Sequence, residues 1–159
     1  MANNGKAKLK TLFVRQILEE ETDSEHGLSM RQLIERLQEY GIEAERKSIY
    51  RDIELLREFG VDIRTYQRHP VEYAIATRDF SLPQLMLLVD AVESCRSLTQ
   101  RQSRALITNL KLLASDPQRD QLDRRIHVSG RIASKNDSVF GHIDLIHDAL
   151  RQRTMVEFM

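Results

Sequence analysis

Residues 44–60 have the sequence Ala-Glu-Arg-Lys-Ser-Ile-Tyr-Arg-Asp-Ile-Glu-Leu-Leu-Arg-Glu-Phe-Gly. Apolar residues recur there at the i, i+4, i+7 spacing of one helical face. They are Ile49, Ile53 and Leu56, and Leu55 and Phe59 are expected to widen the stripe. Gly60 stands where a helix commonly ends on a residue of positive φ. The stretch therefore predicts an amphipathic helix over residues 45–59.

The opposite side of this helix is polar and partly basic. At about 100° per residue, the side chains that project there are Lys47, Tyr50, Arg51 and Glu54. A helix that buries one face and offers basic N-terminal turns on the other is built like the helix that enters the major groove in helix-turn-helix proteins. An ordinary amphipathic helix with a solvated charged face has the same pattern, so the flanking segments must distinguish the two.

The residues before this stretch predict two more helices. Residues 6–21 carry an apolar stripe formed by Leu9, Leu12, Phe13, Ile17 and Leu18. Ser29 and Gln32 form a capping box, which opens a second helix that ends at Tyr40–Gly41. The residues of this helix expected to point inward are Leu33, Ile34 and Leu37. Because residues 42–44 make only a short turn, the second and third helices are expected to form a helix-turn-helix.

After Gly60 the hydrophobic period changes from that of a helix to that of a strand. Two runs alternate apolar and polar residues on either side of a turn at residues 68–70. Their apolar members are Val61 and Ile63, and Val71, Tyr73 and Ile75. A hairpin at residues 61–76 directly after the third helix is typical of the wing of a winged helix, with Arg68 and His69 at its tip. Residues 1–80 therefore predict a winged helix-turn-helix, and a small α+β domain without a DNA role is the alternative.

The next 44 residues predict a helical connector. Capping boxes at Ser81–Gln84 and Thr99–Gln102 open two helices, and residues 118–123 suggest a short third piece. The two apolar stripes are Leu85, Leu88, Val89, Val92 and Cys95, and Leu106, Ile107, Leu110 and Leu113. Two such helices cannot bury both stripes alone, so residues 81–124 are also expected to support a homodimer, mainly through residues 82–114.

The last segment, residues 125–159, is more irregular. It predicts a short helix over residues 143–150 and a final strand over residues 155–159. A lone strand has no partner for its ladder, so this segment is interpreted as the start of a truncated domain. The fold class expected for the chain is mostly α with a small β-hairpin: a winged helix-turn-helix followed by a helical linker or dimerisation region.

Composition and motifs narrow the classes of function. Lysine plus arginine and aspartate plus glutamate number 24 each, so any nucleic-acid binding must come from a local basic surface rather than from net charge. A polar N-terminus and a single cysteine favour a reducing cytoplasm, and no apolar run has the length of a membrane helix. No phosphate loop, zinc spacing or nucleophile elbow is present, so no enzyme and no cofactor are predicted. His142 and His147 lie about 140° apart on a helix, which disfavours a shared metal.

With these residues in place, the chain resembles the bacterial winged helix-turn-helix (DeoR-like) transcriptional regulators that carry a C-terminal WYL domain. The resemblance covers nearly the whole chain in order. The matching segments are residues 46–57 (RKSIYRDIELLR), 80–85 (FSLPQL), 88–92 (LVDAV), 143–150 (IDLIHDAL) and 156–158 (VEF). It implies a sequence-specific regulator that binds double-stranded DNA. The residues it implies at the DNA are Arg46, Lys47, Ser48, Tyr50 and Arg51, with Arg68 and His69 of the wing at the backbone or minor groove. Asp52 is expected to fix the helix against its neighbours instead.

The resemblance does not extend to the ligand-sensing part of these regulators. This chain has no tryptophan and stops where the WYL domain would begin, so no effector or effector-binding residue is assigned. It is expected to be either an N-terminal fragment of such a regulator or a natural short form.

A protein-interaction module on the same scaffold is the alternative function. The neutral overall charge favours it, as do Glu45, Glu54 and Glu58 on or near the presumed DNA face. The distinguishing feature is whether Arg46, Lys47, Arg51 and Arg68 form one basic surface or are interrupted by acidic residues.

Overall fold

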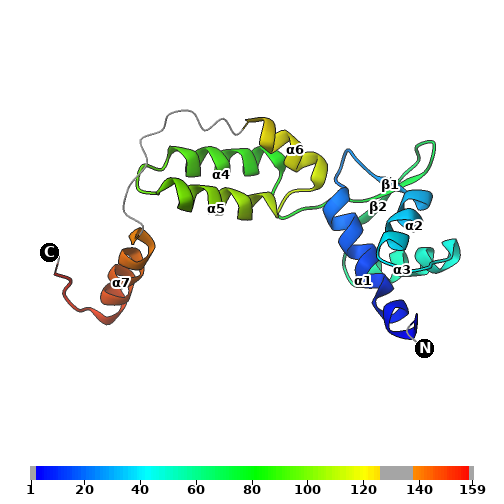
Figure 1. The fold of residues 1–159 in the computed structure, drawn as a ribbon, viewed down its shortest axis with the longest axis horizontal. Coiled ribbons are helices and arrows are strands. Elements are labelled where there is room, and N and C mark those ends of the chain that lie inside the picture. Colours follow the sequence, from blue (N-terminus) through cyan, green and yellow to red (C-terminus); the bar gives the residue numbers. More distant parts are fainter. Residues whose placement is uncertain (1–2, 126–137, 158–159) are drawn as a thin grey trace.

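The computed structural model describes residues 3–125 and 138–157. Helices dominate these residues, and a small three-stranded antiparallel sheet accompanies them (Figure 1). The helices are α1 (Asn3–Glu21), α2 (Met30–Glu39), α3 (Arg46–Glu58), α4 (Leu82–Ser94), α5 (Gln100–Lys111), α6 (Asp116–Arg125) and α7 (Val139–Gln152). The strands are β1 (Leu28–Ser29), β2 (Ile63–Tyr66) and β3 (Glu72–Ile75). No helix among the described residues is long and apolar enough to cross a membrane.

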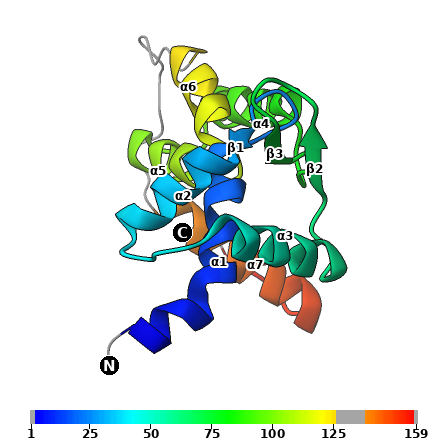
Figure 2. The ribbon, with the colours of Figure 1, turned by 90° about the vertical axis from the view of Figure 1, so that its right-hand side faces the viewer.

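The first three helices and the sheet share one apolar core, and Figure 2 shows α3 lying across the lower side of this unit with the strands above it. Fully buried members are Val14, Ile17, Leu18, Leu33, Leu37, Ile49 and Ile53. The expected capping box opens α2, where Gln32 accepts a hydrogen bond from the Ser29 backbone N–H at 2.9 Å. Gly60 follows α3 at φ 101°. A residue with a Cβ would be strained there, so the expected end of the helix is confirmed.

Two of the expected apolar stripes are wrong in detail. Leu9 and Leu12 of α1 are 47% and 59% exposed, whereas Val14, which was not expected in the stripe, is buried. Leu55 and Phe59 of α3 are 54% and 77% exposed. The physical reason is that α1 and α3 meet partly through polar groups, so the apolar contact between them is narrower than either helical pattern alone suggests.

The sheet contains one strand more than the expected hairpin. β2 and β3 pair antiparallel over the expected segments, with Ile63 opposite Ile75, and β1 pairs with the other edge of β3. A two-residue strand is too short to produce an alternating pattern, which is why β1 could not be predicted. β3 is the central strand, and it buries the three consecutive residues Tyr73, Ala74 and Ile75. The expected alternation of buried and exposed positions is therefore not kept in this strand.

Helices α4, α5 and α6 form a second apolar cluster. Its buried members are Leu85, Val89, Ile107, Ala114 and Leu122. The box at Thr99 is confirmed, since its backbone N–H donates to Gln102 at 3.0 Å. A further pair of the same kind opens α6, which is longer than the expected piece at residues 118–123. There the Gln118 backbone N–H donates to the Ser115 hydroxyl at 3.4 Å, and the Ser115 N–H donates to the Gln118 side chain at 3.3 Å.

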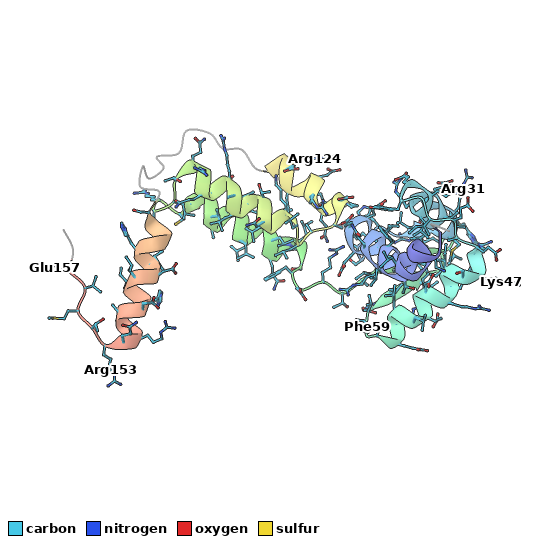
Figure 3. All side chains as sticks on the ribbon, turned by 60° about the horizontal axis from the view of Figure 1, so that its bottom comes forward. Arg31, Lys47, Phe59, Arg124, Arg153 and Glu157 are labelled. Atoms are coloured by element: carbon cyan, nitrogen blue, oxygen red, sulfur yellow. The ribbon has the colours of Figure 1, made fainter. Side chains whose placement is uncertain are left out.

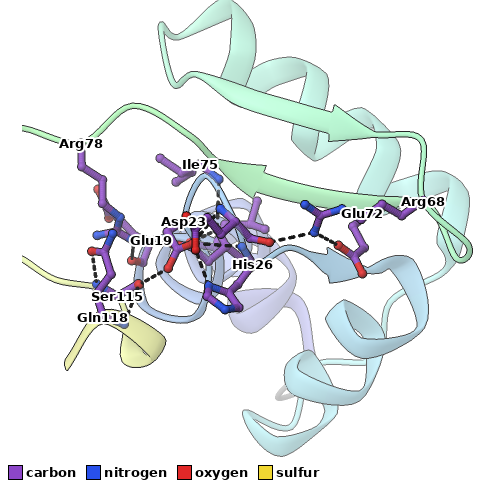
Figure 4. Close-up of polar contacts among 12 residues, drawn as sticks. Glu19, Asp23, His26, Arg68, Glu72, Ile75, Arg78, Ser115 and Gln118 are labelled. Atoms are coloured by element: carbon purple, nitrogen blue, oxygen red, sulfur yellow. Dashed lines mark hydrogen bonds and ion pairs between the residues drawn. The ribbon is translucent and has the colours of Figure 1, made fainter. Parts of the chain in front are cut away.

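A buried carboxylate joins this cluster to the N-terminal unit (Figure 4). Asp23 is 2% exposed and accepts hydrogen bonds from the Ser115 hydroxyl at 2.7 Å and from the backbone N–H groups of Glu25 and His26 at 2.8 and 2.9 Å. Burial alone would raise the pKa of Asp23, but these hydrogen bonds outweigh it and lower the pKa below its usual value. One carboxylate thus fixes the loop after α1 and the start of α6 together.

Arg78 reinforces the same junction from the other side of the loop. Its guanidinium donates to the carbonyl oxygens of Glu19 and, at 2.6 Å, Thr22. The Thr22 hydroxyl in turn accepts from the Ile75 backbone N–H at 3.0 Å. The segment between β3 and α4 is therefore tied to the end of α1 by side chains that bind backbone groups.

The C-terminal expectations are only partly met. Helix α7 includes the expected residues 143–150 and extends beyond them at both ends. The final strand is wrong for residues 155–157, which lie in no strand, and residues 158 and 159 lie outside the described residues. A single strand without a neighbour cannot form ladder hydrogen bonds, which explains the difference.

Candidate nucleic-acid interface

Helix α3 presents its polar side at the outer surface of the N-terminal unit. Ile49, Ile53 and Leu56 bury its inner face, each at 4% exposure or less. No acidic residue lies in its first turn, and its N-cap residue, Glu45, makes no side-chain capping bond. The partial positive charge of a helix N-terminus attracts anions such as phosphate. The free backbone N–H groups at this end of α3 therefore favour a negatively charged ligand, whereas the exposed carboxylate of Glu45 at the N-cap opposes one.

The basic residues of the N-terminal unit divide sharply by their partners. Within residues 9–80, most arginines and lysines are paired with acids: Lys10 with Asp52, Arg15 with Glu19, Arg31 with Glu35, Arg36 with Glu21, Arg57 with Glu54, Arg64 with Asp62 and Arg68 with Glu72. Arg78 is held by backbone carbonyls. Among the described residues, Arg46, Lys47 and Arg51 have neither an ion pair nor a hydrogen bond, and all three are exposed. Within residues 9–80, the unpaired positive charge is thus concentrated on the first two turns of α3.

Of the three acidic residues expected to interrupt this surface, Glu54 and Glu58 lie in the C-terminal half of α3, whereas Glu45 is exposed directly before Arg46. Glu54 is bound to Arg57 at 2.6 Å, and Arg57 also donates to the Ile63 carbonyl at 2.9 Å and to the Thr65 hydroxyl at 2.8 Å. Glu54 is therefore engaged in fastening the end of α3 to β2. Glu58 lies further along, at the C-terminal end of the helix. Figure 3 shows Lys47 and Phe59 at opposite ends of α3.

Tyr50 is half-turned towards the sheet rather than fully outward. Its ring meets that of Tyr73 edge-on, with 6.2 Å between the centroids, and 39% of the residue stays exposed. Burial, together with the hydrogen bond to Tyr50, raises the pKa of Tyr73 to about 12, although Arg46 and Arg57 oppose the shift. The contact braces the N-terminal half of α3 against β3.

The free energy of unfolding should fall as the pH rises from about 10 towards 12, because the folded protein keeps a proton on Tyr73 that the unfolded chain releases at its ordinary pKa. Tyr73→Phe should flatten this part of the pH profile, since it removes the ionisable group. Urea melts across this range test the effect, with Tyr66→Phe as the control. Equal alkaline slopes in wild type and Tyr73→Phe would contradict the assignment.

Ser48 does not join the unpaired basic residues. It is half-buried and accepts a hydrogen bond from Lys10 of α1. Lys10 also pairs with Asp52 at 2.8 Å, and the Thr11 hydroxyl donates to Asp52 at 2.7 Å. Asp52 is 6% exposed, so its expected role of fixing α3 against a neighbouring helix is confirmed. Ser48 belongs to this same polar contact.

Of the two residues expected at the hairpin tip, Arg68 is paired with other groups and His69 is exposed. Arg68 pairs with Glu72 at 2.8 Å, donates to the Glu25 carbonyl at 2.8 Å and lies over the Tyr66 ring at 4.9 Å. Its charge is therefore largely balanced where it stands. His69 is exposed at the same turn.

A residue that the sequence did not single out also borders the surface. A hollow of about 360 Å³ lies between α2 and the start of α3, and its lining includes Arg31, Gln38 and Arg46. The Arg31 side chain is 87% exposed, although it contacts Glu35 at 2.8 Å. Its position in the first turn of α2, directly after the Ser29 cap, is the feature of the sequence that could have pointed to it. Exposed ion pairs are weak, so Arg31 can exchange Glu35 for another anion.

Comparison with protein-family models, with curated proteins and with solved structures finds no match to this chain. The site is therefore characterised by its own geometry. Its central feature is an exposed, unpaired basic trio (Arg46, Lys47 and Arg51) on a helix end. Within the described residues, no three His, Cys, Asp or Glu side chains gather in a way that could hold a metal ion.

Proposed function

We propose that this chain is a sequence-specific DNA-binding transcriptional regulator of the winged helix-turn-helix type. In this proposal α2 and α3 form the helix-turn-helix, α3 enters the major groove, and the β2–β3 hairpin is the wing. The resemblance to the regulators with a WYL domain supports the assignment, and so does the order of three helices followed by a hairpin.

The observation that carries the proposal is the unpaired basic trio. In a protein of zero formal net charge, paired cations contribute little to attraction of a polyanion, because a neighbouring carboxylate cancels most of their field. Cations without a partner keep their full charge available to phosphate or to a guanine edge. Their concentration on one helix end matches the demands of a groove-binding helix.

The geometry of the DNA suits such a helix. The major groove is about 12 Å wide and admits one α-helix. If α3 enters with its N-terminal turns first, Lys47 and Arg51 lie one turn apart on the leading side, close to bases or phosphates. Arg46 and Arg31 then lie towards the phosphate backbone beside α2. Tyr50, braced by Tyr73, holds the helix at a fixed angle to the sheet.

A selection from random double-stranded DNA followed by a salt titration tests this function. The full chain should enrich a defined site, and the logarithm of the binding constant should fall linearly with the logarithm of salt concentration. Three to four phosphate contacts per copy predict a slope of about −3 to −4 for each copy bound, on the basis of about 0.9 per contact. Failure to enrich any sequence, or binding that does not change with salt, would overturn the proposal.

Arg51→Ala should weaken binding to the selected site by about 1–3 kcal/mol if Arg51 contacts a guanine edge. The same variant should relax the sequence preference at one base position, whereas a phosphate contact would weaken all sequences equally. Arg104→Ala, which removes the same charge from an exposed position on α5, is the control. Selection repeated with both variants distinguishes a base contact from a phosphate contact.

A protein-interaction role for the same helix is the second candidate, and one observation favours it. Leu55 and Phe59, on the C-terminal half of α3, are 54% and 77% exposed. Exposed apolar side chains of this size are typical of protein contacts when they cluster. Phe59→Ser should leave DNA binding intact under the main proposal. Enrichment of no DNA sequence, together with an α3-dependent protein complex, would favour the second candidate.

A further inference from the structure

Helices α4 and α5 leave a wide uncharged groove along one side. The groove measures about 560 Å³, and Leu88, Val92, Cys95, Leu106, Leu110 and Leu113 lie along it. None of the described residues that line it is charged, in a chain of which 30% is charged. Its other side is different, because α6 packs there through the buried Leu122. Among the helices that the structure describes, α6 therefore packs on the side of the pair away from the groove.

The apolar surface continues past both rims of the groove. Leu87 lies one turn before Ala91, and Leu112 lies nearly one turn after Asn109, and both Ala91 and Asn109 line the groove. Leu87 and Leu112 are each 69% exposed. The apolar surface therefore extends beyond the groove on both sides. A single helix is too narrow to cover this surface, so its partner must be at least two helices wide.

We propose that this surface, called here the α4–α5 face, pairs with the same face of a second copy to form a four-helix layer. Two helices of 13 and 12 residues extend about 20 Å and 18 Å, and together they are about 20 Å wide. Their area is about 400 Å² in projection and more as accessible surface. This is on the order of the ~800 Å² that each partner buries in a standard interface.

The absence of charge favours a second copy over an unrelated protein. In a two-fold symmetric interface each patch meets itself, so a charged residue near the axis meets a like charge. An uncharged face avoids this repulsion without any complementary pattern. Helix α7 of the same chain is the rival occupant, because Ile143 and Leu150 leave it with an exposed apolar side. A single helix would fill the groove but leave Leu87 and Leu112 at the rims uncovered.

The inference stands independently of DNA binding, and its consequence for DNA is indirect. Pairing through the α4–α5 face would hold two copies of α3 in one assembly. The second half-site is then bound at a high effective concentration, without any new type of contact. This compensates for the small number of unpaired cations that each copy of α3 carries.

Light scattering on the full chain, without DNA, tests the inference. Wild type should have a mass of twice 18.5 kDa at micromolar concentration. Leu87→Glu and Leu112→Glu should each weaken the dimer at least about 10-fold. Because both leucines are exposed, neither change removes a contact from the core of one copy. Gln100→Glu, which adds the same charge at an exposed position in the first turn of α5 that does not line the groove, is the control and should remain dimeric.

The single cysteine supplies a second readout in the same samples. Cys95 lines the groove, so its reaction with a thiol reagent should slow as protein concentration rises and should quicken in Leu112→Glu. A monomer at every concentration overturns the inference. So does a Cys95 reaction rate that is independent of protein concentration and rises in Ile143→Glu, because that result assigns the groove to α7. A dimer unaffected by both leucine substitutions places the interface elsewhere and overturns it as well.

Discussion

Ile53→Ala should lower the free energy of unfolding by about 2–5 kcal/mol. Ile53 is 1% exposed and lies in the core shared by α1, α2, α3 and the sheet. Removing its side chain loses the transfer free energy of three carbon atoms and leaves a cavity, because helices that pack on several sides collapse only partly. Urea melts followed by circular dichroism measure the change, and an unaltered m-value shows that the unfolded state is unaffected.

Leu55→Ala is the matched control for this substitution. Leu55 lies two residues further along the same helix and is 54% exposed, so its truncation should change stability by no more than about 0.5 kcal/mol. The pair separates burial from helix propensity, because both changes introduce alanine into α3. A larger loss for Leu55→Ala than for Ile53→Ala would mean that the buried face of α3 has been assigned to the wrong side.

Replacing Arg46, Lys47 and Arg51 together by Ala should abolish specific DNA binding while leaving the fold unchanged. None of the three makes an ion pair or hydrogen bond within the described residues, so the thermal midpoint should stay close to that of wild type. If all three contact phosphates, the salt slope should become shallower by about 3 for each copy bound. A fluorescence anisotropy titration with the selected site, repeated at several salt concentrations, measures both the affinity and the slope.

The triple variant Arg96→Ala, Arg101→Ala, Arg104→Ala serves as the control, because it removes the same charge from exposed positions in and beside α5. It should retain the affinity and most of the salt slope of wild type. Equal losses in the two triple variants would indicate that net charge, rather than the unpaired basic trio, drives the binding. Full affinity in the Arg46, Lys47 and Arg51 variant would remove α3 from the interface.

Several features follow from short-range sequence alone. The capping boxes at Ser29 and Thr99 satisfy backbone groups within four residues of themselves, so the start of each helix is specified locally. Gly60 ends α3 because the chain needs a positive φ at that position, which glycine adopts without steric cost. The change of period after Gly60 likewise predicts the hairpin. These interactions need no distant partner, and the structure has each of them where the sequence indicated it.

What the tertiary structure decided depends on residues far apart in the chain. Leu55 and Phe59 fit the apolar stripe of α3, but the core of the N-terminal unit forms around Ile49, Ile53 and Leu56 and leaves both of them exposed. Asp23 gives no sign in the sequence that it binds Ser115, which lies 92 positions away. The candidate site has the same origin. Sequence places many arginines in the N-terminal unit, but only the packing of helices and strands shows which of them are neutralised by a carboxylate. Ion pairing depends on separations of a few ångströms between side chains, and the fold alone sets those separations.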